Sequence, residues 1–194
     1  MVTGQSLASD YGEDYYKTGL GPHPYARSEP WLGFFSNIAS RIKQDFNPVV
    51  VLDAGCAIGL LVESLHNHGI KAVGYDFSPY AIAQAPEHMK PYMFCRSIAE
   101  PFEHEADFIT CIEVLEHMQE DDALAAVRNM TQVSDIILFS STSDDFSEPT
   151  HINVRPQEYW LKAFENEGFV WRSDYNASYV CPWAKVFMRK MSCK

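Results

Sequence analysis

The sequence predicts a doubly wound α/β fold with a mostly parallel sheet. From Val49 onward, short β-branched runs alternate with segments of helical periodicity. The first run breaks at glycine, and the helical segments are preceded or ended by capping residues. Strands that alternate with helices form βαβ units, whose strands run parallel and are covered by helices on both faces.

Length and composition fit one domain. The 194 residues are 46% hydrophobic and 21% charged, close to the globular average. No internal repeat or linker divides the chain, so we expect a single domain over residues 1–194. It comprises a Gly-, Pro- and Tyr-rich N-terminal arm over residues 1–27 and an α/β core over residues 28–194.

The first expected helix follows the arm. Ser28 can cap it, Pro30 is tolerated in its first turn, and apolar residues recur at helical spacing up to Ile42. The helix is expected to end before Pro48.

Two strands that end in acidic residues come next. Val49–Asp53 is β-branched and is followed by a helix over Gly59–Asn67 that Gly69 ends. Lys71–Asp76 is the second strand, and the helix Ser78–Ala85 begins at its own cap residue.

The second half of the chain continues the alternation. Its expected strands are Pro91–Arg96, Asp107–Ile112, Ser134–Ser140 and Trp183–Lys190. Its expected helices run over about Asp121–Met130 and Pro156–Glu167.

Charge and cysteine content restrict the partners and the compartment. The 26 acidic and 15 basic residues give a net charge of −11, which repels phosphate backbones, so no nucleic-acid partner is expected. The five scattered cysteines include no C-x-x-C pair, which argues against a disulfide framework or a thiolate zinc site. No apolar run approaches the ~20 residues of a membrane span, and residues 1–10 do not resemble a secretory signal. We predict a cytoplasmic protein without a membrane partner and leave its oligomeric state open.

The loop after the first strand carries the clearest binding signal. It reads VLDAGCAIG, in which Gly55 allows a tight turn and a helix start near Gly59 offers free N–H groups. Asp76 ends the second strand 21 residues after Gly55. That spacing suits a carboxylate that binds the hydroxyls of an adenosine ribose.

The glycine spacing excludes a nicotinamide dehydrogenase. A G-x-G-x-x-G pattern beginning at Gly55 needs glycines where the chain has Ala57 and Leu60. Asp53 would also lie against a pyrophosphate, and like charges repel. A carboxylate there suits a cationic ligand such as S-adenosylmethionine, which carries an ammonium and a sulfonium.

These motifs resemble the class I S-adenosylmethionine-dependent methyltransferases. The resemblance covers about residues 28–190 and rests on VVVLDAGCAIG, VGYDFS and ADFITCIEVLEH. It implies a Rossmann-like, doubly wound, mostly parallel seven-stranded sheet with helices on both faces and an antiparallel last strand. It also implies S-adenosylmethionine as the cofactor and a small-molecule methyl acceptor.

The resemblance implies roles for particular residues. Asp53 would orient the cofactor's amino group, Asp76 would bind the ribose and Phe77 would flank the adenine. Arg27 either pairs with the methionine carboxylate, as the arm closes over the cofactor, or is a solvated surface charge. The complete expected set is Asp53, Gly55, Cys56, Ala57, Gly59, Asp76, Phe77, Ile98, Ala99, Ile112 and Arg27. Ile98 stands where the family often has an acid that binds the adenine, which leaves nearby backbone groups for that contact.

The segment after the fourth strand carries the candidate catalytic residues. Glu113, Glu116 and His117 share one face if a helical turn starts at Glu113. Methyl transfer is an in-line displacement that mainly needs positioning, and an oxygen nucleophile also benefits from a base such as His117. His151, past the fifth strand, lies in a loop that covers the acceptor in this family. We therefore select His117, Glu113 and His151; the alternative is that the acids cap backbone and His117 packs.

A divalent metal is a second interpretation of the same residues. The pattern E-x-x-E-H resembles ubiquinone-pathway O-methyltransferases and small-RNA 2′-O-methyltransferases, some of which use a divalent cation. His151 would complete such a site. The metal-free base is preferred, and no metal ligand is assigned.

The expected function is methyl transfer to a small molecule. THINVRPQEYWLKAFENEGF resembles the C-terminal part of methyltransferases found beside sugar and polysaccharide biosynthesis enzymes. Oxygen is the preferred target, with a sugar or secondary metabolite as the acceptor, and nitrogen stays open. The alternative class is a non-catalytic S-adenosylmethionine-binding accessory or sensor protein.

Overall fold

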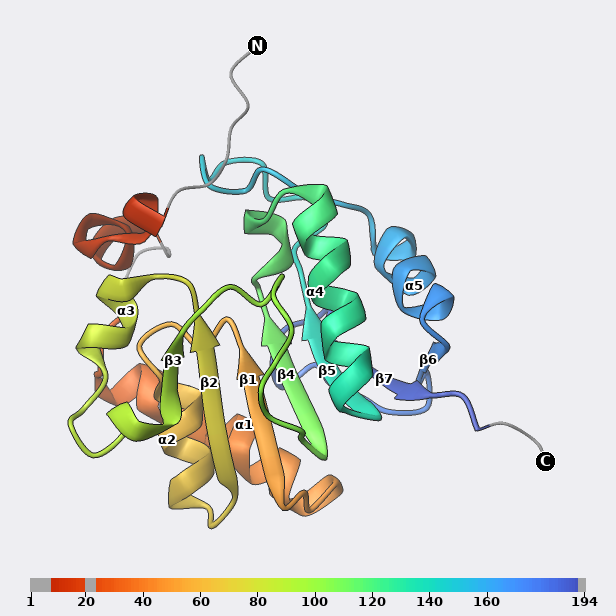
Figure 1. The fold of residues 1–194 in the computed structure, drawn as a ribbon, viewed down its shortest axis with the longest axis horizontal. Helices are drawn as coiled ribbons and strands as arrows, with labels where there is room; N and C mark the ends of the chain where they lie inside the picture. Colours follow the sequence, from red (N-terminus) through yellow and green to blue (C-terminus); the bar gives the residue numbers. More distant parts are fainter. Residues whose placement is uncertain (1–7, 20–23, 192–194) are drawn as a thin grey trace.

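The strands of the computed structural model, which describes residues 8–19 and 24–191, form one seven-stranded sheet. Its order is β3-β2-β1-β4-β5-β7-β6 (Figure 1). The strands are β1 (Val50–Ala54), β2 (Lys71–Asp76), β3 (Met93–Cys95), β4 (Phe108–Ile112), β5 (Ile136–Ser140), β6 (Phe169–Trp171) and β7 (Lys185–Arg189). β7 is antiparallel to both β5 and β6, and the other neighbours are parallel. The predicted fold class, with its antiparallel last strand, is confirmed.

Helices connect the strands. They are α1 (Glu29–Asp45), α2 (Leu60–Asn67), α3 (Pro79–Gln84), α4 (Glu120–Val133) and α5 (Gln157–Asn166). Short 3-10 turns occur at Ala8–Tyr11, Lys90–Tyr92 and Leu115–His117, and a π-helical turn at Tyr15–Gly19.

Most elements lie within a few residues of their predicted ranges, and the differences concern element ends. α2 begins one residue late because Gly59 adopts φ +80°. The hydroxyl of Ser78 accepts from the N–H of Ala81 at 3.1 Å, as expected of a cap. The predicted side-chain cap at Ser28 is wrong. A cap residue accepts from the second or third helical N–H; Pro30, the second helical residue, has none, and the Ser28 hydroxyl does not accept from Trp31, the third.

The residue pattern did not locate strand β6. Its three residues, Phe169–Trp171, pair antiparallel with β7. A run this short follows directly on the end of α5 and shows no alternation of its own. Its strand conformation comes from pairing with β7, a contact that local sequence does not encode.

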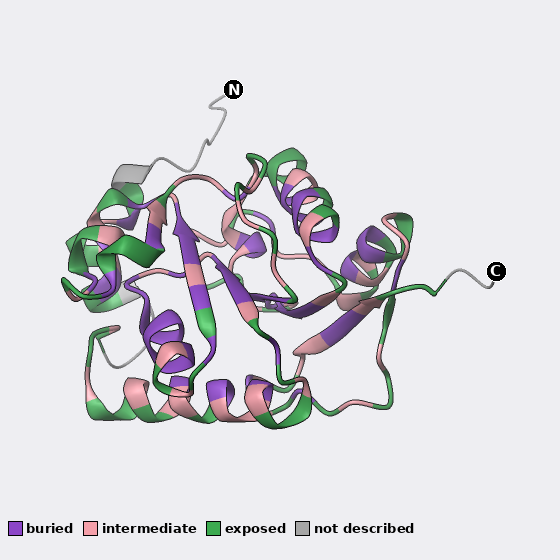
Figure 2. Ribbon diagram, turned by 60° about the horizontal axis from the view of Figure 1, so that its bottom comes forward, coloured by how far each residue is buried: buried purple, intermediate pink, exposed green. Residues whose placement is uncertain are grey.

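Side chains of the central strands alternate between two buried clusters on opposite faces of the sheet. Val51 and Phe108 pack in the cluster that includes α1, α2 and α3, whereas Leu52 and Ile109 pack in the cluster that includes α4 and α5. Successive strand residues point to opposite faces, which explains the division. Figure 2 shows the buried residues gathered in the strands and on the helix faces that meet them.

The described part of the arm joins the first of these clusters. Tyr11 and Tyr16 are buried within it. The hydroxyl of Ser78 donates to the carbonyl oxygen of Tyr11 at 2.7 Å, which fixes the arm beside the end of β2.

Gly74 in β2 leaves no room for a side chain. A Cβ there would lie 2.6 Å from Cys56 Sγ and 2.9 Å from Val62 Cγ2. We expect Gly74→Ala to lower the free energy of unfolding, measured by urea denaturation, by about 1–3 kcal/mol. Gly33→Ala is the matched control, because Gly33 is exposed in α1 with no atom within 4 Å of such a Cβ. It should be neutral or stabilising by up to about 1 kcal/mol, and equal stability of the two variants would contradict this account.

Candidate functional site

A cavity of about 1030 Å³ opens at the carboxyl ends of β1, β2 and β4. The order of the sheet reverses between β1 and β4, which is where open α/β sheets bind ligands. The cavity walls combine tyrosines of the arm, residues of the strand ends and the loop after β5.

The loop between β1 and α2 is held in shape by its backbone. Gly55 has φ +83°, and a Cβ there would lie 2.3 Å from a methyl carbon of Val114. The N–H groups of Gly55 and Cys56 both donate to the carbonyl oxygen of Tyr75, at 2.8 and 3.0 Å. The loop is therefore tied to β2, with its backbone lining the cavity.

Asp76 connects this loop to the start of α3. Its Oδ2 accepts from the N–H of Ala57 and its Oδ1 from the N–H of Ser78, both at 2.8 Å. Burial raises the pKa of Asp76, and the two N–H donors oppose that effect. The carboxylate lines the cavity and is oriented by groups on both sides.

Asp53 is the buried acid of β1. Its Oδ1 accepts from the hydroxyl of Thr110 on β4 at 2.6 Å. Burial raises the pKa of Asp53 to about 7, although the Thr110 hydrogen bond lowers it. A carboxylate in this environment favours a cationic partner, because a nearby positive charge stabilises its ionised form.

The cavity is lined by all the predicted cofactor-binding residues except Gly59, Ala99 and Arg27. Gly59 shapes the loop instead, since a Cβ there would lie 2.6 Å from Met93 Cε. Lining places the others where a cofactor is expected, and their individual roles stay predictions.

Arg27, predicted to pair with the methionine carboxylate of the cofactor, forms an ion pair with Glu63 in the structure. Its Nε donates to Glu63 Oε2 at 3.1 Å, and its Nη2 donates to the other oxygen of the same carboxylate. This two-pronged ion pair joins the end of the arm to α2 and lies outside the cavity lining. The pairing of Arg27 with the methionine carboxylate stays a prediction, and it requires the guanidinium to exchange Glu63 for the ligand.

The turn after β4 differs from the predicted helical face. Glu113 has φ +52°, and the helical turn begins only at Leu115. Glu113 Oε1 accepts from Trp183 Nε1 at 2.8 Å, so this side chain faces the segment before β7. Glu113 lines the cavity, but it is Glu116 that lies beside the histidines.

His117 and His151 meet across the cavity wall. Their ring centroids are 4.7 Å apart. His117 Nδ1 lies 3.1 Å from Thr150 Oγ1, and His151 Nδ1 lies 2.8 Å from the carbonyl oxygen of Asp145. Burial and the neighbouring His151 lower the pKa of His117 to about 4, so its imidazole is neutral at pH 7.

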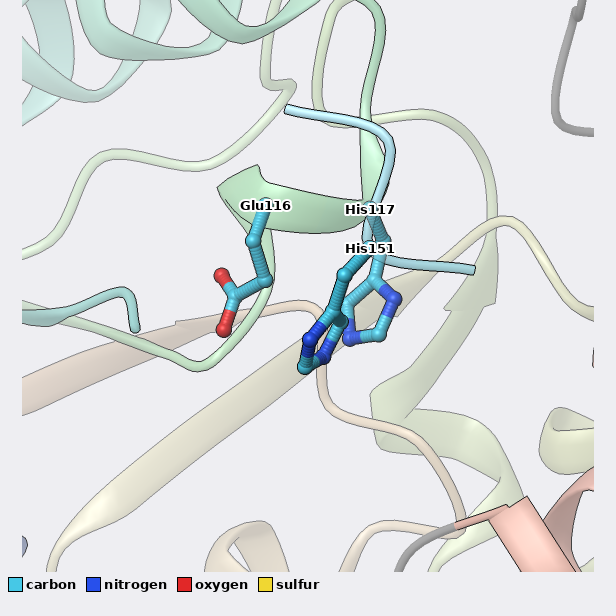
Figure 3. Close-up of side chains that lie close together, drawn as sticks. All are labelled: Glu116, His117 and His151. Atoms are coloured by element: carbon cyan, nitrogen blue, oxygen red, sulfur yellow. The ribbon is translucent and has the colours of Figure 1, made fainter. Parts of the chain in front are cut away.

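Glu116 completes a compact group with the two histidines (Figure 3). One ligand atom from each of Glu116, His117 and His151 lies within 4.8 Å of the others. Among the described residues, Glu116 Oε2 is buried without a hydrogen-bond partner. A carboxylate and two imidazoles suit a divalent metal such as Zn²⁺ or Mn²⁺.

The sequence predicted some residues of the cavity lining and missed others. Tyr11, Tyr15, Tyr16 and Tyr25 of the arm line the cavity, as the expected closure of the arm requires. Glu148 was missed, although it stands three residues before His151. An acid that close to a candidate histidine in one loop was the available signal.

Within the described residues, no helix combines the length and the apolar character needed to cross a membrane. The cytoplasmic location and the absence of a nucleic-acid partner stay predictions.

Comparisons of the whole chain find methyltransferases. A family model described as "Methyltransferase domain" matches residues 31–173. The ubiquinone biosynthesis O-methyltransferase of Methylococcus capsulatus is 25% identical over 142 residues, which cover 69% of this chain and 60% of that protein. The protein of the same name from Neisseria meningitidis serogroup C is 30% identical over 123 residues, covering 58% and 51%. The chain thus matches about half to three-fifths of the length of these curated relatives.

Solved structures share the fold. Magnesium protoporphyrin IX methyltransferase from Synechocystis PCC 6803, with bound S-adenosylhomocysteine, aligns with a TM-score of 0.62 and 18% identity over 82% of this chain and 83% of that one. A sugar N-methyltransferase from Streptoalloteichus aligns with a TM-score of 0.66 and 13% identity over 85% and 90%.

Asp53 is expected to make the stability of the ligand-free protein depend on pH. Its pKa is about 7 in the folded state against 3.8 for an ordinary carboxyl. As pH rises from about 4, the carboxyl of Asp53 loses its proton in the unfolded chain but keeps it in the folded state. The free energy of unfolding is therefore highest below about pH 4 and falls as pH rises towards 7. The raised pKa of Asp76 acts in the same direction.

Urea denaturation across this pH range measures the effect. Asp53→Asn removes the titrating group and keeps an acceptor for Thr110, so it should flatten the decline. An unchanged pH dependence in Asp53→Asn would show that Asp53 is not its source.

Proposed function

The chain belongs to the class I S-adenosylmethionine-dependent methyltransferases, and from this premise we propose that it transfers a methyl group to an oxygen atom of a small-molecule acceptor. One observation carries the proposal: a single cavity combines the carboxylates of Asp53 and Asp76 with the imidazoles of His117 and His151. The first pair suits the cofactor, and the second suits the acceptor.

The residues after β1 and β2 fit S-adenosylmethionine. The cofactor supplies an electrophilic methyl group on a sulfonium. Asp53 binds its ammonium, which would stabilise the ionised form of this buried carboxylate. Asp76, already oriented by two backbone N–H groups, accepts hydrogen bonds from the ribose hydroxyls, and Phe77 and Ile98 flank the adenine.

The hydrogen bonds around His117 assign its proton. The Thr150 hydroxyl donates its one proton to Glu148 Oε1, so its oxygen accepts from His117 Nδ1–H. The unprotonated nitrogen of His117 is then Nε2. This atom takes the proton of the acceptor hydroxyl as the methyl group is transferred, which is general base catalysis.

A divalent metal held by Glu116, His117 and His151 is the second candidate for this step. The unpartnered Oε2 of the buried Glu116 favours it. A metal there would lower the pKa of the acceptor hydroxyl.

The acceptor class is supported by the relatives. Ubiquinone biosynthesis O-methyltransferases and a sugar N-methyltransferase are among the similar proteins. A sugar or secondary metabolite is therefore our proposed acceptor, with oxygen as the target and nitrogen as the alternative. A non-catalytic S-adenosylmethionine-binding protein is the alternative class, and the His117 and His151 pair supports an enzyme instead.

Asp76→Ala should weaken S-adenosylmethionine binding by about 1.5–3 kcal/mol, since it removes a charged hydrogen-bond acceptor. Calorimetric titration measures this affinity, and NAD should not bind. Asp107→Ala is the matched control, because Asp107 also accepts from two backbone N–H groups but lies outside the cavity lining. Equal cofactor affinity in both variants would remove Asp76 from the ribose role.

His117→Ala should lower the turnover rate by about 10²–10⁴-fold, the usual effect of losing a general base. Its S-adenosylmethionine affinity should stay within a few-fold of the unaltered protein. The rate is measured with any acceptor that the protein methylates. His88→Ala is the control, because His88 is exposed and outside the cavity lining. A His117→Ala protein of normal rate would refute both the base and the metal.

The two roles of His117 differ in their dependence on metal. If His117 acts as the base alone, activity survives EDTA and His151→Ala mainly raises the apparent binding constant of the acceptor. If a metal acts, EDTA abolishes activity, and Glu116→Ala and His151→Ala both resemble His117→Ala.

A further inference from the structure

The cavity is lined by acidic side chains and by no lysine or arginine among the described residues. Its acidic residues are Asp53, Asp76, Glu113, Asp122, Asp145 and Glu148. Asp53 and Asp76 face the expected cofactor. The cofactor assignment does not use the other four acids.

Glu148 is the most enclosed acid of the loop after β5. Its side chain is 15% exposed, against 45% for Asp145 in the same loop. Its Oε2 lies 3.3 Å from His151 Nε2, and its Oε1 accepts from the Thr150 hydroxyl. No lysine or arginine of the described chain forms an ion pair with it. A cation in the cavity would therefore be the first fixed positive charge beside this carboxylate.

Tyr15 lies near the same carboxylate, and the ring of Tyr11 packs against it. The rings of Tyr11 and Tyr15 are 4.7 Å apart, and each meets the His117 ring edge-on, at 5.8 and 6.1 Å. Burial and then the charge of Glu148 raise the pKa of Tyr15, which places this side chain within the field of Glu148. Aromatic rings beside a carboxylate are a recurrent arrangement for binding an alkylammonium group.

A second buried acid lies behind the histidines. Glu116 is fully buried, and its Oε2 has no hydrogen-bond partner among the described residues. Figure 3 shows Glu116 beside the rings of His117 and His151. Burial and the charge of Glu113 raise the pKa of Glu116 well above its usual range, so Glu116 offers a polar oxygen to this region and not a further negative charge.

We propose that the methyl acceptor is a small amine that is cationic at neutral pH, and that Glu148 binds its ammonium group beside the aromatic pair of Tyr11 and Tyr15. The inference rests on the proposed function and names the class of its acceptor. The ammonium donates to Glu148, while the reacting hydroxyl faces His117, whose Nδ1 is 4.0 Å from Glu148 Oε1. Phosphorylated or carboxylated acceptors are repelled by the same residues.

Three phenols of matched shape test the charge preference. Tyramine is cationic, 4-ethylphenol is neutral and 4-hydroxyphenylacetate is anionic at pH 7. Binding of each is measured by ligand-observed NMR and calorimetry on the full chain, treated with EDTA and saturated with S-adenosylhomocysteine. We expect tyramine to bind about tenfold more tightly than 4-ethylphenol, and 4-hydroxyphenylacetate to bind most weakly.

Two variants assign the preference to Glu148. Glu148→Gln keeps the shape of the side chain and should abolish the advantage of tyramine over 4-ethylphenol. Asp144→Asn removes one charge from the same loop but from an exposed side chain outside the cavity lining. It should keep the preference of the unaltered protein.

Other results would overturn the proposal. These are equal affinities for the three phenols, tightest binding of the anion, or no binding of any phenol to protein that holds S-adenosylhomocysteine. If Glu148→Gln weakens S-adenosylmethionine relative to S-adenosylhomocysteine and leaves tyramine binding intact, Glu148 serves the cofactor's sulfonium instead. A protein that fails to bind S-adenosylhomocysteine at all refutes the proposed function itself, which is a separate result.

Discussion

Two hydrogen bonds to the carboxylate of Asp76 hold the ligand end of the sheet together. They come from the N–H groups of Ala57 and Ser78, which belong to the loops after β1 and β2. A buried carboxylate is costly unless its oxygens are bonded, so both loops are constrained to present their N–H groups. The loops that lead into α2 and α3 and the expected ribose site all depend on this arrangement.

Unusual backbone conformations gather at the same edge. Ala57 and Glu113, two of the three described non-glycine residues with positive φ, line the cavity. Left-handed backbone is unfavourable for such residues and persists only where surrounding contacts fix it. At Ala57 that contact is Asp76, and at Glu113 it is a backbone N–H donated to the carbonyl oxygen of Ser140 at 3.0 Å. The turn at Glu113 separates its side chain from His117.

This turn explains which parts of the site the sequence could predict. Strand ends follow from hydrophobic patterns, so Asp53 and Asp76 were placed correctly at the edge of the sheet. The positions of Glu113 and Glu116 depend on the positive φ of Glu113, which glutamate does not favour. The helical spacing placed both acids on the face of His117, whereas only Glu116 lies beside the two histidines. The ion pair of Arg27 could not be predicted for a related reason, because its partner Glu63 is 36 residues away and only folding brings them together.

Charged side chains have different partners inside and outside the cavity. Arginines pair with acids outside the cavity lining, as Arg155 does with Glu120 and Arg189 with Asp135. The carboxylates of the cavity have hydroxyl, imidazole, indole and backbone N–H partners in place of lysine or arginine. Any cation that binds the folded protein there also stabilises it, since the unfolded chain has no such site. Binding of a positively charged ligand and stability of the folded protein are therefore linked, whereas an anion that the acidic lining repels gives no such stabilisation.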